Sequence, residues 1–105
     1  MKTALLTTVF FASVAHHADA EDFVITMSGS NYAPSSITAS VGDRIQFIND
    51  DTTDHNVFVP SATHALDLGK QEPGSELELV LRTPGVFDVE CVFHAHMLLN
   101  VEVGS

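Results

Sequence analysis

The chain has 105 residues, of which 45% are hydrophobic and 17% charged, and its formal net charge is −10 at pH 7. A surface this acidic repels nucleic acid and anionic membranes, so the charge argues against either as a partner. It attracts a basic protein partner, although solubility alone also explains it. The single cysteine excludes an intramolecular disulfide.

The N-terminal segment has the layout of a secretory signal peptide. Lys2 provides a positive start, residues 4–15 form an apolar stretch, and Ala18-Asp19-Ala20 offers the small side chains that signal peptidase requires. The apolar stretch is shorter than the roughly 20 residues that cross a bilayer, which argues against a membrane anchor. We therefore expect residues 1–20 to be cleaved and residues 21–105 to form a single exported domain, periplasmic if the source is bacterial.

The rest of the chain shows short alternating segments separated by Gly, Pro, Asn and Asp, and no long amphipathic helix pattern. In chain order, strands are expected at residues 23–27, 37–39, 44–49, 56–59, 76–81, 86–91 and 98–103. Residues 61–74 form the one long stretch that we expect to be irregular. Seven or eight short strands joined by turns indicate an all-β fold, an antiparallel sandwich or barrel.

Alternation along a strand predicts which side chains face the core. In residues 76–81 the leucines are expected to point inward and the glutamates toward water. In residues 86–91, Phe87, Val89 and Cys91 share one face. Cys91 is therefore expected to point inward, at the point where the chain leaves the sheet.

Three side chains in the last turn suit a copper ion. Cys91, His94 and Met97 offer a thiolate, an imidazole and a thioether at intervals of three residues. Thiolate and thioether favour Cu(I), imidazole serves both oxidation states, and a His₂Cys set with a weak axial Met is typical of electron-transfer copper sites. A second histidine must come from elsewhere, and His55, at the start of an inner strand, is the candidate.

Other interpretations of the same residues are weaker. A single inward cysteine is most often core packing, but the neighbouring ligand types argue against that here. Structural zinc favours closed Cys and His sets without a thioether, and a Cys91–His94 nucleophile pair lacks recognisable oxyanion donors. His96 is an alternative ligand to His94 or an accessory group beside the metal, whereas His64 has no assigned role.

The motifs resemble those of plastocyanin and amicyanin, small blue-copper proteins of the cupredoxin family. The resemblance covers residues 23–103 and rests on Tyr32-Ala33-Pro34, Val41-Gly42-Asp43, His55-Asn56-Val57 and the Cys-x₂-His-x₂-Met spacing of residues 91–97. It implies an eight-stranded Greek-key β-sandwich that binds one copper ion, cycling between Cu(I) and Cu(II). It also implies the ligands His55, Cys91, His94 and Met97, with Asn56 bracing the site. The chain departs from the family at Val92, Phe93 and Ala95, where loops of this length often carry prolines, and at His96, which replaces an apolar or aromatic residue.

These observations predict a type 1 copper protein that acts as a soluble one-electron carrier between redox partners. It is expected to be monomeric, without stable membrane insertion, and not an enzyme by itself. The alternative is a periplasmic copper carrier or copper-tolerance protein of the same fold, in which the metal is the cargo.

Overall fold

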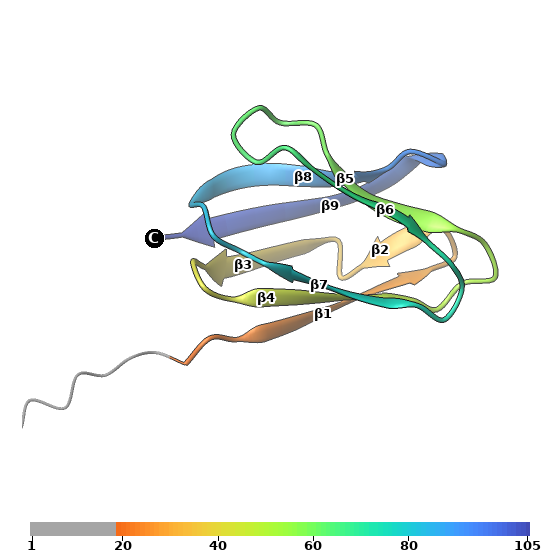
Figure 1. Cartoon of the computed structure of the whole chain (residues 1–105), viewed down its shortest axis with the longest axis horizontal. Helices are drawn as coiled ribbons and strands as arrows, with labels where there is room; N and C mark the ends of the chain where they lie inside the picture. Colours follow the sequence, from red (N-terminus) through yellow and green to blue (C-terminus); the bar gives the residue numbers. More distant parts are fainter. Residues whose placement is uncertain (1–18) are drawn as a thin grey trace, which may run out of the picture.

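A computed structural model of the protein describes residues 19–105, so the expected signal peptide, apart from Asp19 and Ala20, lies outside the described residues. Nine strands in this part of the chain form two sheets, which pack as a sandwich (Figure 1). One sheet runs in the order β2 (Asn31–Ala33), β1 (Asp22–Ser28), β4 (Arg44–Asn49) and β7 (Glu76–Val80). The other runs β3 (Ser36–Ser40), β9 (His94–Gly104), β8 (Gly85–Cys91), β5 (His55–Val59) and β6 (Leu66–Gln71).

The core lies between the two sheets and follows the alternation of the sequence. β4 and β8 alternate buried and more exposed side chains along their length. The predicted inner face of residues 86–91 is confirmed, because Phe87, Val89 and Cys91 are all buried. Each fully buried aliphatic or aromatic side chain contributes about 1.5–3 kcal/mol to folding. The cluster therefore stabilises the packing of the two sheets, and the packed sheets position the loops at both ends.

The predicted all-β sandwich is confirmed, with nine strands where eight were expected. The two sheets are mixed rather than antiparallel, because β1 pairs with β4 and β3 pairs with β9 in parallel. Parallel strands cannot be joined by a tight hairpin. Here β2 and β3 intervene between β1 and β4, and the chain passes to the other sheet and back before β4 begins.

The prediction that residues 61–74 are irregular is wrong, since β6 (Leu66–Gln71) lies within them. β6 lies at the edge of the sheet, and among the described strands it pairs with β5 alone. Its apolar residues, Leu66 and Leu68, are only partly buried, and Gly69 has a φ of 78°. Backbone pairing with β5 defines the strand, and its residues supply little of the apolar alternation by which a strand is recognised.

The connections relevant to the candidate site lie at one end of the sandwich. In Figure 1 the β8–β9 turn, the β4–β5 loop and the β1–β2 turn all lie at the end opposite the C-terminus. Residues 19–105 include no helix of sufficient length and hydropathy to span a membrane.

The opposite end of the sandwich is closed by the β3–β4 turn, in which the buried Asp43 joins two segments. Its carboxylate accepts hydrogen bonds from the amide of Glu21, at 2.9 Å, and from the amide of Ser40, at 2.8 Å. These two donors, the Glu21 amide first, hold the pKa of Asp43 below its usual range. The charged carboxylate is therefore the form that stabilises the fold.

We predict that Asp43→Asn lowers the free energy of unfolding near neutral pH, with a loss that shrinks on acidification. A carboxyl whose pKa is lower in the folded state stabilises above its unfolded pKa, about 3.9 for Asp, and this contribution disappears as pH falls through the folded value. Urea unfolding at neutral and acidic pH measures both quantities. Asp50→Asn is the matched control, because no side-chain hydrogen bond involves Asp50 among the described residues; equal pH dependence in the two variants would contradict the prediction.

Candidate metal centre

Three of the four predicted ligands come together at one end of the sandwich. His55, Cys91 and His94 place one donor atom each within 4.8 Å of the others. The Sγ atom of Cys91 lies 3.8 Å from Nδ1 of His55 and 3.7 Å from Nδ1 of His94. Both imidazoles therefore present the same ring nitrogen to the sulfur.

The β8–β9 hairpin brings Cys91 and His94 together. β8 ends at Cys91 and β9 begins at His94, and these two residues are register partners across a turn formed by Val92 and Phe93. His55 is the first residue of β5, the other neighbour of β8 in the sheet. Three strands of a single sheet, β5, β8 and β9, thus provide all three donor atoms.

A bulge in the hairpin changes where the side chains after His94 point. Glu90 pairs with Leu98, whereas the next residue, Cys91, pairs with His94, so residues 95–97 have no partner on β8. In a regular strand, residues three apart point to opposite faces. The bulge removes this constraint: Met97 is 1% exposed and lies in the core cluster, while His94 is partly buried at the end of the sandwich. The role of Met97 as an axial ligand remains a prediction.

Asn56 lies where a brace for the site is expected. Its Oδ1 atom accepts a hydrogen bond from the amide of Val92, at 2.8 Å, which links β5 to the turn next to Cys91. The hydroxyl of the buried Tyr32 donates to the backbone carbonyl of Asn56, at 2.6 Å. Burial raises the pKa of Tyr32, and the charges of Cys91 and Glu90 raise it further, so this hydroxyl keeps its proton.

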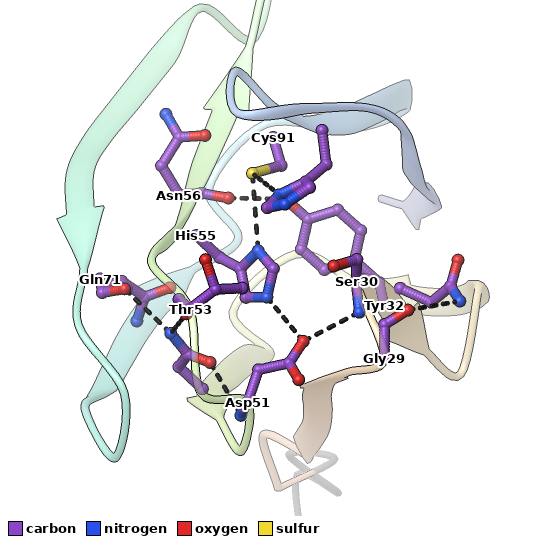
Figure 2. Close-up of polar contacts among 12 residues, drawn as sticks. Gly29, Ser30, Tyr32, Asp51, Thr53, His55, Asn56, Gln71 and Cys91 are labelled. Carbon is purple, nitrogen blue, oxygen red and sulfur yellow. Dashed lines mark hydrogen bonds and ion pairs between the residues drawn. The ribbon is translucent and has the colours of Figure 1, made fainter.

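One contact of the site was not predicted from the sequence. Nε2 of His55 lies 2.8 Å from Oδ2 of Asp51, and the His55 ring lies between this carboxylate and the sulfur of Cys91 (Figure 2). The amide of Ser30 also donates to Oδ2 of Asp51, at 2.8 Å. The Ser30 amide first, and the His55 ring second, hold the pKa of Asp51 below its usual range. The signal in the sequence was an acidic residue four positions before a candidate ligand, but the loop holds three acidic residues that sequence alone does not distinguish.

Within residues 19–105, the two other histidines lie outside this cluster. His96 is exposed, and its ring centroid is 6.2 Å from that of His94. Of the two alternatives in the loop, His94 is therefore the one that lies beside Cys91. His64 stacks on Phe87 with ring centroids 4.7 Å apart, near the start of β8 rather than its ligand-bearing end.

The donor set fits copper better than zinc. Two imidazole nitrogens and one thiol sulfur in a buried cluster, with a thioether buried in the same hairpin, combine soft and intermediate ligands. Such a set suits an ion that alternates between Cu(I) and Cu(II), whereas structural zinc sites are closed by four Cys or His ligands.

Comparison with known proteins identifies the family. A family model described as a cupredoxin-like domain matches residues 2–99. The chain belongs to the cupredoxin-like family. The expected cofactor, one copper ion, is confirmed by this membership together with the donor set.

Solved structures support the same assignment. A variant of amicyanin in its Cu(I) form is similar with a TM-score of 0.72 and 25% identity, over 85% of this chain and 87% of that one. The purple cupredoxin from Nitrosopumilus maritimus shares the fold with a TM-score of 0.69 and 22% identity, over 82% of this chain and 100% of that one. The copper-containing nitrite reductase from Thermus scotoductus SA-01 has a TM-score of 0.72 and 19% identity over 79% of this chain, but this cupredoxin spans only 22% of that enzyme.

We predict that Asn56→Ala destabilises the copper-free protein by about 1–3 kcal/mol, because the partly buried amide of Val92 loses its acceptor. Urea unfolding measures the difference. Asn100→Ala is the matched control: its side chain donates to Asp88 on the exposed face of the same sheet, at 3.1 Å. That change is expected to cost less than about 0.5 kcal/mol. Equal losses in the two variants would show that Asn56 does not brace the hairpin.

Proposed function

We propose that this cupredoxin is a one-electron carrier that binds its copper through His55, Cys91, His94 and Met97. The observation that carries the proposal is the convergence of two imidazole nitrogens on the sulfur of a buried cysteine, at 3.8 and 3.7 Å. When bound, copper supplies a Cu(II)/Cu(I) couple at this site. Because the ligands are already held by a hairpin and an adjacent strand, little rearrangement accompanies a change of oxidation state.

The surroundings of His94 suit electron exchange with a partner protein. Cys91 and His55 are buried, whereas His94 is partly exposed and lies closest to the surface. Val92, Phe93 and Leu98, on the same hairpin, are 61%, 53% and 48% exposed. Exposed apolar side chains on the hairpin that carries one accessible ligand allow close approach of a partner, and the net charge of −10 favours a partner with a basic surface.

In this proposal no substrate is transformed, and the protein is not an enzyme by itself. The likeness to the nitrite reductase concerns the fold alone, because the chain matches 22% of that enzyme at 19% identity. Enzymatic turnover would need residues beyond a single cupredoxin site.

A copper carrier is the second candidate. The exposed His96 beside His94, with ring centroids 6.2 Å apart, offers a nitrogen to which copper can pass during transfer to another protein. A carrier releases copper to a modest chelator, whereas an electron carrier retains it through repeated cycles of oxidation and reduction. Loss of copper during cycling would favour copper transport over electron transfer as the function.

We predict that the Cu(II) protein shows an intense thiolate-to-copper absorption band, which a mild reductant bleaches reversibly. Cys91→Ser is expected to abolish the band, because an alkoxide or hydroxyl cannot replace the thiolate. His94→Ala and His96→Ala form a matched pair: the first is expected to lose the band and the second to keep it. A band that survives His94→Ala but not His96→Ala would transfer the ligand role to His96.

We also propose that the protein is exported and cleaved after Ala20, as a single domain of residues 21–105. Asp19, Ala20 and Glu21 are exposed, so a protease can reach this bond. Cleavage there would replace the Glu21 amide, 2.9 Å from Oδ1 of Asp43, with a charged amino group facing a carboxylate.

The N-terminus of the protein isolated from cells that export it is therefore expected to be Glu21. Intact mass and N-terminal sequencing measure this directly. A mature chain that retains Ala20, or one that starts several residues later, would contradict the proposed site. Ala20→Leu should slow processing, because signal peptidase accepts only small residues there.

A further inference from the structure

The imidazole of His55 is held on both sides. Nδ1 lies 3.8 Å from the sulfur of Cys91, and Nε2 lies 2.8 Å from Oδ2 of Asp51 (Figure 2). The His55 side chain is 0% exposed and that of Asp51 is 17% exposed, so the contact is largely shielded from water. An ionised carboxylate can only accept a hydrogen bond. In a neutral ring, donation to this carboxylate requires the proton on Nε2, which leaves the lone pair of Nδ1 facing the sulfur.

Asp51 is itself fixed by contacts with two other segments. Its Oδ2 atom accepts a hydrogen bond from the amide of Ser30 in the β1–β2 turn, at 2.8 Å, and its own amide donates to Oδ1 of Asn49, at 3.0 Å. The Asn49 side chain donates in turn to the backbone carbonyls of Thr53 and Gln71, at 3.0 and 2.9 Å. The carboxylate thus has a defined position, set by the β1–β2 turn, β4 and β6 together.

We propose that Asp51 is a positioning residue that holds His55 in the Nε2–H tautomer and lowers the reduction potential of the copper site. The inference rests on the proposed function, in which His55 is a copper ligand. A carboxylate bonded to the far nitrogen of a metal-bound imidazole makes the ring a stronger donor. Its negative charge also favours the more highly charged Cu(II) over Cu(I). Both effects act in the same direction and lower the potential.

Other acidic residues of the β4–β5 loop allow the specific contact to be separated from general charge. Asp50 directly precedes Asp51, and Asp54 lies three residues after it. Neither side chain forms a hydrogen bond among the described residues. Removing either one takes away the same unit of charge near the site without touching the His55 ring.

The decisive experiment compares the reduction potentials of the copper-loaded wild type, Asp51→Asn, Asp51→Ala, Asp50→Asn and Asp54→Asn. A single oxygen of Asp51 accepts both hydrogen bonds, so the amide oxygen of Asn can keep both and only the charge is lost. We expect Asp51→Asn to shift the ratio of Cu(II) to Cu(I) affinity about tenfold toward Cu(I), which raises the potential by about 59 mV. Asp51→Ala also frees the ring and should weaken Cu(II) binding about 10- to 100-fold.

The control variants decide whether the position of the charge against the His55 ring matters, beyond the net charge of the loop. Asp50 is exposed and Asp54 partly buried, and neither side chain forms a hydrogen bond with the His55 ring. Charges near the surface are screened by salt, so Asp50→Asn and Asp54→Asn are expected to shift the potential less than Asp51→Asn, with a difference that persists at high ionic strength. Equal shifts in Asp51→Asn and Asp54→Asn would overturn the proposal.

Nitrogen-15 NMR of the copper-free protein tests the tautomer without reference to the metal. We expect the proton of His55 on Nε2 in the wild type, and a mixture of tautomers in Asp51→Ala. If the proton lies on Nδ1 in the wild type, the proposed role of Asp51 is overturned, while the proposed function is unaffected. A copper-loaded wild type without a thiolate-to-copper band would instead overturn the proposed function, so the two failures are distinguishable.

Discussion

One hydrogen bond joins the two pieces of backbone that carry the candidate ligands. The register between β5 and β8 pairs only Phe58 with Glu90, so the backbone ladder ends before the site. Beyond that point the link is made by the side chain of Asn56, whose Oδ1 atom accepts a hydrogen bond from the amide of Val92, at 2.8 Å. Asn56 follows His55 in the chain and Val92 follows Cys91. The bond therefore ties together the immediate neighbours of two candidate ligands, and the distance between the imidazole and the sulfur depends on it.

The site end of the sandwich differs from the rest of the interior in polarity. Asn49, His55, Asn56 and Gln71 are buried there, while the core beneath them is built almost entirely from apolar side chains. Burying polar groups costs free energy unless they are hydrogen-bonded, and the amide of Asn49 offsets this by bonding two backbone carbonyls. An apolar residue at Asn49 would leave those carbonyls without this donor, and the loop that holds Asp51 would lose its anchor.

The proposed electron carrier divides its surface between two kinds of interaction. Long-range attraction comes from a net charge of −10, which steers a basic partner and weakens as salt rises. Short-range contact comes from Val92 and Phe93, which stand exposed at the tip of the hairpin. Because these residues form the turn between Cys91 and His94, the shape of the docking surface and the geometry of the ligands are set by the same few residues. A change at the tip therefore affects partner binding and the copper site together.

Residue patterns along the chain were enough to predict the all-β fold class and the residue types expected to bind the metal. Alternation in residues 86–91 placed Cys91 on the inner face, and burial of apolar side chains enforces that choice. The spacing of Cys91, His94 and Met97 identified copper because ligand softness is a property of the side chains themselves. β6 was not predicted because backbone hydrogen bonds with β5 define it, and its side chains show little of the apolar alternation that is typical of a strand.

The arrangement around His55, in contrast, follows from tertiary packing. Its distance from Cys91 depends on the order of strands in a sheet, and residues 36 positions apart in the chain carry no local signal of their proximity. The bulge at residues 95–97, which buries Met97 and leaves His96 exposed, likewise arises from the register of β8 with β9. The choice of Asp51 from three acidic residues of one loop follows from where the β1–β2 turn places the amide of Ser30. Each of these features depends on segments brought together by packing, which side-chain patterns along a single strand do not encode.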